Sequence, residues 1–506
     1  MNKKIVFCAD LFPGSGYGHI RRSTVLAKAL HERGYTTVFI LDDRAIELAE
    51  RFVLPDNVIC KPDGVTYAEF ALAQKAEAVV VDSYELGDAF ETVITDAGRR
   101  LVVIDDHEVP RRADLVVNYK PGVLPRDFIR PGQAALLGDQ FFLSDNKRLK
   151  PRVRKPGEPM SVVIHAGGNG DFSLLSAVAE RLVVAADRHG WQLTWLCPHA
   201  QSQIWVQDRI PQNHQNMIGW QADATALWHG FDLVVGPAST SVYEAIMQGS
   251  APLSFAVSPT QTDDRAPWVK IGHLLHLEHA ETQDPAVLDS TFDLIDARLA
   301  DLQSILARHS AGLDGRGPRR VAAAIDQLLN GQEIENCATS VSDEVAIRPC
   351  LAIDAHAFLI ARNAPKVRMV STDPNHIITW PEHVRWWLAG TTERFLVEKN
   401  CRPLAFFWHR AHQVDGTNYL VGGWFPASDA PLFTFVIQLL DWQLKHGDAT
   451  HQGHTWIATI NRDNKAVIAL NQRFGYKEAS AKTRDAAKKL FPGTDETFAI
   501  LERAGQ

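Results

Sequence analysis

A glycine-rich stretch at residues 11–23, LFPGSGYGHIRRS, constrains the fold of this chain more than any other feature. Residues 5–9 before it form an apolar run that predicts a buried parallel strand, and residues 24–33 after it place leucine and alanine at helical spacing. A strand, a glycine-rich turn and a helix in this order predict an α/β fold. The glycines let a ligand approach the backbone, where N–H groups at the start of the helix can bind a diphosphate.

The same turn contains a candidate catalytic residue. His19 lies two residues before Arg21, and a histidine held beside a bound phosphate can act as a general base near neutral pH. The candidates for binding the substrate are its neighbours Gly16, Tyr17, Gly18 and Arg22. The residues alone leave a second interpretation open, in which His19 and the arginines only cap the helix or face solvent.

Length and composition limit the classes of protein that this chain can be. Its 506 residues predict about three domains, and 45% hydrophobic with 22% charged residues is typical of a globular protein. The net charge of -8 argues against a nucleic-acid partner, and no segment is apolar over the length of a membrane span. The six cysteines form no CxxC pair and the N-terminus shows no signal-peptide pattern, so we expect a cytoplasmic protein.

Residues 1–150 alternate strand-like and helix-like segments, which predicts a first domain with a parallel sheet covered on both faces. Several of the strand-like runs end in polar residues that are candidates for substrate binding, namely Asp82, Tyr84, Asp105 and Asn118. Ligands of open α/β sheets bind beyond the carboxyl ends of the strands, so we expect these side chains to line one cleft with His19. The alternative is that the aspartates only cap the helices that follow.

A proline-rich segment at residues 151–159 ends this pattern, and residues 160–330 restart it as a second α/β domain. Its candidate substrate-binding residues lie in two turns between a strand and a helix, and they are Gly167, Gly168, Asn169, Ser239, Thr240, Ser241 and Glu244. Hydroxyl groups at a helix start can hold a phosphate, and Glu244 can accept both hydrogens of a ribose diol. The alternative for this second turn is a helix cap with a surface glutamate.

Two α/β domains with a cleft between them resemble the GT-B glycosyltransferase architecture. Within it, residues 16–23, GYGHIRRS, resemble the GxGHxxR signature of the UDP-sugar hydrolase of pseudaminic acid biosynthesis. Further matching stretches lie at residues 81–84, 104–106, 113–118, 165–168, 239–244 and 314–321. This resemblance implies hydrolysis of a diacetamido-trideoxy UDP-hexose to free sugar and UDP, with His19 orienting or deprotonating the attacking water and with no cofactor.

The sequence departs from that family at positions that affect the substrate. Arg21 and Ser23 stand where the family commonly has methionine and cysteine, and its Asp-Asn-Gln sequence is replaced near residues 260–262. Two other functions stay open at this point. One is a GT-B glycosyltransferase that uses the same UDP-sugar with a carbohydrate acceptor, and the other is a non-catalytic nucleotide-sugar binder.

Three histidines, at residues 273, 276 and 279, have a spacing that could suggest a metal site. They lie in the apolar stretch HLLHLEH with no cysteine nearby, which is weak evidence for metal ligands. We therefore predict no metal site in this protein.

Residues 330–345 are polar and predict a second linker, and residues 345–506 predict an α+β domain with a mostly antiparallel sheet. This part resembles a GNAT acyltransferase of the type that acetylates the 4-amino group of a UDP-sugar, through residues 362–368, 378–383, 461–466 and 474–476. The resemblance implies acetyl-CoA as the cofactor. The candidate cofactor-binding residues are Gly422, Gly423, Asn461 and Asn464.

The cofactor site of this domain departs from the GNAT pattern. The RxxGxG turn, whose N–H groups hold the diphosphate of coenzyme A, is replaced by PASDAPL at residues 426–432. Proline supplies no N–H group, and an aspartate would repel a diphosphate. Asn471 replaces the tyrosine that many members use as general acid. We therefore predict weak or absent acetyl-CoA binding, with a bifunctional acetyltransferase-hydrolase as the alternative.

Overall fold

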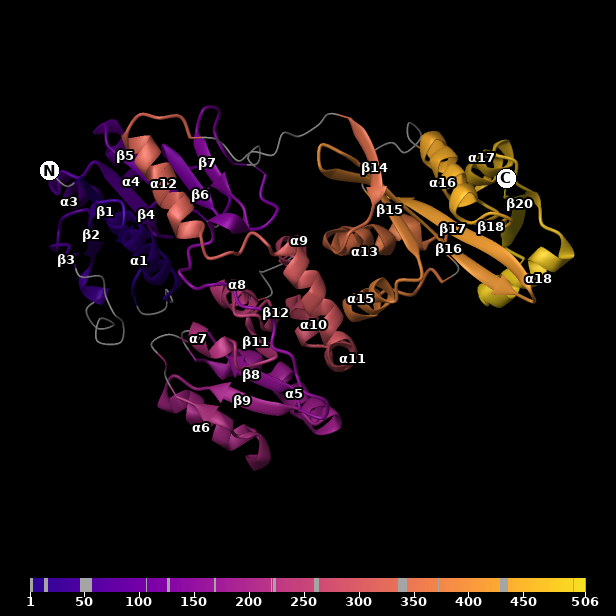
Figure 1. The fold of residues 1–506 in the computed structure, drawn as a ribbon, viewed down its shortest axis with the longest axis horizontal. Coiled ribbons are helices and arrows are strands. Elements are labelled where there is room, and N and C mark those ends of the chain that lie inside the picture. The colour runs from indigo at the N-terminus through magenta and orange to yellow at the C-terminus, as the bar shows by residue number, and fades with distance from the viewer. Residues whose placement is uncertain are drawn as a thin grey trace. The chain divides into compact units, whose positions relative to one another are not determined.

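The computed structural model describes residues 3–12, 17–45, 57–105, 107–124, 128–167, 170–219, 221, 224–258, 264–334, 344–371, 373–427, 436–494 and 496–505. The chain divides into two compact units, Met1–Thr339 and Ser340–Gln506. In Figure 1 the first unit runs from indigo through magenta, and the second runs from orange to yellow. None of the helices in the described ranges is both long and apolar enough to cross a membrane.

The first unit begins with a seven-stranded parallel sheet in the order β3-β2-β1-β4-β5-β6-β7. Its strands are β1 (Lys4–Ala9), β2 (Thr36–Leu41), β3 (Val58–Cys60), β4 (Ala78–Asp82), β5 (Arg100–Ile104), β6 (Leu115–Asn118) and β7 (Ala134–Leu137). Its helices are α1 (Gly18–His31), α3 (Tyr67–Ala73) and α4 (Asp88–Asp96), with short 3-10 turns at Asp43–Ala45 and Asp139–Phe141. The middle of β1 is fully buried because helices cover both faces, which explains its continuous apolar run.

A second, six-stranded parallel sheet follows in the order β10-β9-β8-β11-β12-β13. Its strands are β8 (Ser161–His165), β9 (Gln192–Leu196), β10 (Met217–Ile218), β11 (Leu233–Pro237), β12 (Ala251–Phe255) and β13 (His276–Leu277). The helices are α5 (Ser176–His189), α6 (Ala200–Arg209), α7 (Thr225–Trp228), α8 (Thr240–Met247), α9 (Arg265–Lys270), α10 (His279–Thr282) and α11 (Pro285–His309), with 3-10 turns at Phe172–Leu175 and Gln212–His214. This is the second Rossmann-like domain that the sequence predicts.

The two parallel sheets are joined by shared packing. Helix α12 (Gly317–Leu329) follows the second sheet in sequence but packs on α1 of the first. Tyr243 of α8 stacks on Phe142 with ring centroids 4.7 Å apart and meets the edge of Tyr119 at 5.7 Å. Because these aromatic side chains belong to one buried cluster with residues of both domains, the N-terminal unit is a single packed body.

The second unit contains a mixed sheet in the order β14-β15-β16-β17-β18-β20-β19. Its strands are β14 (Val345–Pro349), β15 (Glu393–Lys399), β16 (Arg402–Val414), β17 (Thr417–Pro426), β18 (Thr455–Asn461), β19 (Lys477–Glu478) and β20 (Phe498–Ala504). The helices are α13 (Ala355–Asn363), α14 (Pro365–Arg368), α15 (Trp380–Leu388), α16 (Val436–Thr450), α17 (Lys465–Arg473) and α18 (Ala481–Leu490), with a 3-10 turn at Ala352–Asp354. The long hairpin β16–β17 confirms the predicted antiparallel character.

Strands β17 and β18 are the parallel pair of this sheet. Their pairing begins at Tyr419 with Thr455 and ends at Val421 with Ile457, although both strands continue for several residues. The two strands therefore separate after Val421, next to the candidate cofactor-binding residues Gly422 and Gly423. The α+β domain has the predicted fold class.

Candidate active site

The strand orders explain why His19 and Asp82 meet. In the first sheet β1 has β2 on one side and β4 on the other, so the chain direction across the sheet reverses between β1 and β4. Ligands of open α/β sheets bind at such a switch point, beyond the carboxyl ends of the two strands. His19 follows β1 on the first turn of α1, and Asp82 is the last residue of β4.

His19 and Asp82 form a buried hydrogen-bonded pair. The distance between His19 Nδ1 and Asp82 Oδ1 is 2.7 Å, and the two residues are 5% and 1% exposed. Arg22 Nη2 also lies 3.1 Å from His19 Nδ1, but the carboxylate is nearer and can only accept. We therefore assign the hydrogen to Nδ1 and the lone pair to Nε2. Asp82 thereby fixes the tautomer in which Nε2 can accept a proton.

Arg22 keeps Asp82 ionised. Its Nε donates to Asp82 Oδ2 at 2.6 Å, its Nη2 donates to Oδ1, and the Ser23 hydroxyl donates to Oδ2 at 3.2 Å. Burial by itself would raise the pKa of Asp82, but the charge and hydrogen bonds of Arg22, together with His19, outweigh burial and hold that pKa at about 2. Asp82 and Arg22 are both candidates for substrate binding. In the structure their charged groups bind each other, next to His19.

Aromatic side chains surround this group. Arg22 Nη1 donates to the Tyr119 hydroxyl, and Tyr84 contacts the edge of the His19 ring with centroids 4.5 Å apart. His107 in turn contacts Tyr84 at 4.4 Å. Tyr84 is 57% exposed while His19 beneath it is buried, so Tyr84 lies on the open side of the imidazole.

Two helix N-termini converge on this turn. A Cβ atom added to Gly18, the first residue of α1, would lie 4.0 Å from the side chain of Thr240, the first residue of α8. The Ser239 hydroxyl caps α8 by accepting from the Ser241 N–H group at 3.3 Å. Unpaired N–H groups and the helix dipole make each N-terminus favourable for an anion, so their meeting point suits a diphosphate.

Arg21 connects the two Rossmann-like domains beside this point. Its guanidinium lies 3.2 Å from Glu244 Oε1 and donates to Thr225 Oγ1 at 2.5 Å. Glu244 is 9% exposed, so its carboxylate is held by Arg21 at the edge of the site rather than free on the surface. From the sequence, Arg21 stood out as a neighbour of His19 and as a departure from the family pattern. Its pairing with Glu244 could not be predicted, because it depends on the packing of the second domain.

The other predicted residues of the N-terminal unit are more dispersed. Asp105 accepts from the Glu108 N–H group at 2.9 Å, and Asn118 accepts from the Lys120 N–H group at 2.9 Å, so both cap their own turns. Gly167 adopts a positive φ of 72° and donates its N–H to His165 Nδ1 at 3.2 Å. Tyr17 precedes α1 and packs against the shared core. Gly16, Gly168 and Asn169 lie outside the described residues.

The histidines at 273 and 276 serve the core of the second domain. His273 Nε2 and His276 Nδ1 lie 2.7 and 2.9 Å from the same Ser254 hydroxyl, and both rings are buried. Burial lowers the pKa of His273 to about 3, so this imidazole is neutral. Among the described residues, the only group of three side chains with metal-ligand spacing lies instead in the C-terminal unit, at Glu393, His409 and His451.

The four candidate cofactor-binding residues of the C-terminal unit all lie within the described part of the chain. Asn464 caps α17 by accepting from the Val467 N–H group, and Asn461 accepts from the Asp463 N–H group at 2.9 Å. Gly422 and Gly423 lie on β17 against Trp408. The turn at residues 426–432 replaces the RxxGxG turn of the GNAT pattern, and its residues 428–432 lie outside the described residues.

Two further residues bear on the cofactor site. The N–H group of Ala427 donates to the Leu404 carbonyl at 2.9 Å, so it is used by the sheet and cannot face a ligand. Asn471 is buried and donates to the Val467 carbonyl at 2.8 Å within its own helix. It stands where many GNAT acyltransferases have a tyrosine that acts as general acid.

No protein-family model and no curated protein matches this sequence. Solved structures match parts of the chain. MurG of Acinetobacter baumannii is 16% identical over 65% of this chain and 100% of its own, with a TM-score of 0.46. MnaA of S. aureus, solved with UDP, is 10% identical over 65% of this chain and 97% of its own, with a TM-score of 0.47. An acetyltransferase of the GNAT family from Streptococcus pneumoniae is 14% identical over 32% of this chain and 100% of its own, with a TM-score of 0.27.

The strand orders establish the fold class independently of these likenesses. The N-terminal unit consists of two Rossmann-like domains in a GT-B arrangement, and the C-terminal unit is an α+β domain of GNAT-like topology. The predicted fold class is confirmed.

Proposed function

We propose that the N-terminal unit hydrolyses a UDP-sugar, cleaving the glycosyl C–O bond to give free sugar and UDP. The observation that supports this most is the 2.7 Å hydrogen bond between His19 and the buried carboxylate of Asp82, at the turn where the N-termini of α1 and α8 meet. The proposed sugar, a diacetamido-trideoxy hexose, rests on the resemblance of residues 16–23 to the pseudaminic-acid hydrolase signature.

His19 is the proposed general base. Water attacks the anomeric carbon of the sugar while the bond between that carbon and the β-phosphate oxygen breaks, and Nε2 of His19 takes the proton from the water. The imidazolium that forms is stabilised by the ionised Asp82 at its other nitrogen. Arg22 in turn holds Asp82 in the charged form, so it supports the base without touching the substrate.

The helix N-termini are the proposed site of the leaving group. As the C–O bond breaks, negative charge grows on the β-phosphate of UDP, and the N–H groups of α1 and α8 face that charge without rearranging. Each helix terminus favours an anion by up to about 2 kcal/mol in a partly buried setting. Ser239, Thr240 and Ser241 lie at this terminus, and Glu244 one turn further on is the proposed ribose acceptor.

For the C-terminal unit we propose a GNAT-like domain that is retained for substrate recognition or assembly. Its diphosphate turn contains prolines and an acid, and the one N–H group described there after Pro426 is already bonded to the sheet. The alternative is a bifunctional acetyltransferase-hydrolase, in which the 4-amino sugar is acetylated before hydrolysis. The separation of β17 and β18 after Val421 is the feature that keeps this alternative open.

Release of UDP without any acceptor tests the proposed hydrolase. The full-length protein is incubated with a panel of 4-amino and 4-acetamido UDP-sugars, with and without acetyl-CoA, and UDP is quantified. We expect UDP from at least one 4-acetamido sugar in water alone. Release that strictly requires a carbohydrate acceptor would indicate the glycosyltransferase, and UDP binding without turnover of any panel member would indicate a non-catalytic binder.

A further inference from the structure

A cluster of histidines around one glutamate lies on the C-terminal sheet, far in sequence from the proposed hydrolase site. Strands β15 and β16 pair so that Glu393 stands directly opposite His409. Side chains of directly opposed residues project from the same face of a sheet, so the carboxylate and the imidazole share one face. Glu393 Oε1 lies 3.4 Å from His409 Nε2.

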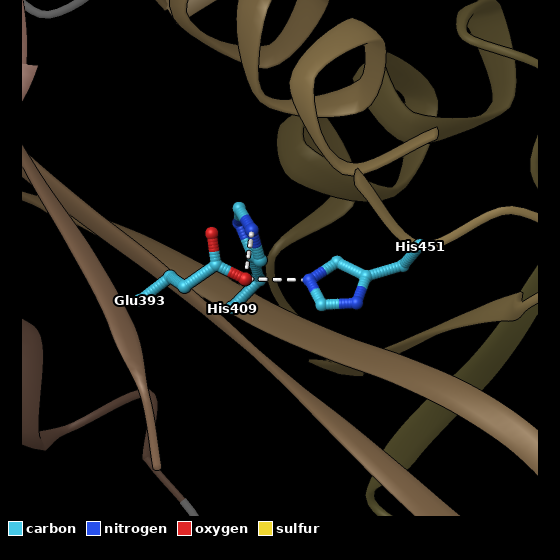
Figure 2. Close-up of side chains that lie close together, drawn as sticks. All are labelled: Glu393, His409 and His451. Carbon is cyan, nitrogen blue, oxygen red and sulfur yellow. Dashed lines mark hydrogen bonds and ion pairs between the residues drawn. The ribbon is translucent and has the colours of Figure 1, made fainter. Parts of the chain in front are cut away.

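Helix α16 contributes the other members of the cluster. His451, just after the helix, places Nε2 2.5 Å from Glu393 Oε1. His446, on the turn before the last one of α16, places Nε2 3.4 Å from Oε2. Gly447 allows this approach, because a Cβ atom there would lie 2.3 Å from the Trp456 ring. Figure 2 shows the imidazole rings of His409 and His451 pointing toward the Glu393 carboxylate.

His409 is the member whose environment is hardest to explain without a ligand. Its side chain is fully buried, yet neither ring nitrogen has a hydrogen-bond partner of acceptable geometry among the described residues. Buried polar groups are rarely left unpaired, because each loses its bonds to water.

We propose that Glu393, His409 and His451 bind a Zn²⁺ ion. One ligand atom from each residue lies within 4.8 Å of the others. Ligand atoms bound to tetrahedral zinc at about 2.0–2.1 Å are roughly 3.3–3.4 Å apart, which matches the 3.4 Å between Glu393 and His409. The 2.5 Å between Glu393 Oε1 and His451 Nε2 is a hydrogen-bond distance, which has to lengthen to this spacing when the ion binds. Two imidazoles and a carboxylate favour zinc over magnesium or calcium, which prefer oxygen ligands.

The surroundings of the cluster fit an ion that enters from solvent. The side chains of Glu393 and His451 are 39% and 22% exposed, which leaves a path to the site and a position for a water ligand. His446 contacts the second carboxylate oxygen and stacks on Trp442 with centroids 4.7 Å apart, so it orients Glu393 from outside the ligand set. A bound ion would connect β15, β16 and the end of α16.

Zinc content and zinc affinity of the full-length protein test the proposal. The purified protein is analysed for metal by mass spectrometry, stripped with EDTA, and titrated with Zn²⁺ by calorimetry and by thermal unfolding. We expect one Zn²⁺ per chain and a higher Tm on adding Zn²⁺. His451→Ala and Glu393→Gln should lose at least about 100-fold in affinity, and His446→Ala roughly 10- to 100-fold, as is typical of an outer partner.

His376→Ala is the matched control. His376 belongs to the same unit and lies 3.0 Å from Glu382, so it is another histidine paired with a glutamate, but it is outside the cluster. This variant should bind Zn²⁺ like the wild type. The site is refuted if wild-type protein binds no Zn²⁺, or if His451→Ala and Glu393→Gln bind it as tightly as His376→Ala does. His451 and Glu393 are partly exposed, so these substitutions leave the buried core intact.

Discussion

Asp82 neutralises a buried arginine and orients a histidine at the same time. Because Arg22 is 5% exposed, removing its carboxylate partner leaves an uncompensated charge in the core. We predict that Asp82→Ala destabilises the N-terminal unit by about 3–5 kcal/mol, and that the double variant with Arg22→Ala loses less than the sum of the two single losses. Urea unfolding measures both quantities.

The control for this prediction is an exposed ion pair of the same unit. Arg188 and Asp293 are 2.8 Å apart with side chains 41% and 46% exposed. Asp293 also lies 2.9 Å from His189 Nε2. Its carboxylate is nevertheless reached by water, so Asp293→Ala should cost about 1 kcal/mol, well below the loss in Asp82→Ala. Equal losses in Asp82→Ala and Asp293→Ala would show that Asp82 is not the buried partner of Arg22.

Two buried histidines predict loss of stability in acid. Burial lowers the pKa of His165 to about 4 and that of His273 to about 3, from about 6.5 when unfolded. The unfolded chain therefore binds more protons below pH 6.5, so stability is complete above about pH 6.5 and is lost as the pH falls toward 4. At pH 5 the loss is about 2 kcal/mol for each histidine.

Urea unfolding at pH 7 and pH 5 measures this loss. His273→Gln removes one titrating group and should flatten the pH dependence, whereas His31→Gln, at an exposed position on α1, should leave it unchanged. A pH dependence that is the same in His273→Gln and in the wild type would contradict the prediction.

At the scale of elements, α1 and α8 are joined by the Arg21–Glu244 ion pair, and this pair complicates the predicted role of Glu244. We predict that Glu244→Ala weakens UDP binding severalfold or more, because a ribose acceptor is lost. If Glu244 only held Arg21 in place, Arg21→Ala would have the same effect.

Comparing UDP with its 2′-deoxy analogue separates these two roles in calorimetry. Loss of the 2′-hydroxyl should weaken binding to the wild type and to Arg21→Ala, but should change little in Glu244→Ala. Asp293→Ala, whose pair is remote from the two helix N-termini in sequence and exposed, serves as the control and should bind UDP like the wild type. Equal discrimination in all four proteins would remove Glu244 from the ribose site.

In the C-terminal unit the pairing of β17 with β18 ends at Val421, and few free N–H donors follow on β17. Pro426 has no N–H group and that of Ala427 is bonded to Leu404. Losing two charge-assisted hydrogen bonds, at about 1.5–3 kcal/mol each, raises a micromolar Kd by at least roughly a hundredfold. We predict no acetyl-CoA binding in the low-micromolar range by calorimetry on the full-length protein, with thermal unfolding of the same sample, which includes the C-terminal unit, as the control for folding. Low-micromolar affinity would restore the bifunctional enzyme.

At the scale of the whole molecule, the sequence predicted elements better than it predicted partners. The apolar runs at residues 5–9 and 78–81 are strands because helices bury both faces, and this can be inferred from composition alone. The sequence predicted that Asp82 lies in one cleft with His19, but their direct hydrogen bond depends on β4 lying next to β1, which the local sequence does not encode. The pairing of Arg21 with Glu244 likewise depends on how two domains pack.

The C-terminal cluster shows the same limit. As metal ligands we considered only histidines that are close in sequence, at 273, 276 and 279. Glu393 and His409 come together only through the register of β15 with β16, and His451 only through the packing of α16 on Trp456. The register of the hairpin was the one signal that could have suggested this cluster.

The kinetics of His19→Ala show whether His19 acts as a base in the N-terminal unit. The rate of UDP release and the Kd for UDP are measured on the same preparation, with His31→Ala, at the other end of α1, as the control. We predict that kcat falls by roughly a hundred- to ten-thousand-fold while the Kd for UDP keeps its wild-type value. A His19→Ala variant that releases UDP at the wild-type rate would contradict it.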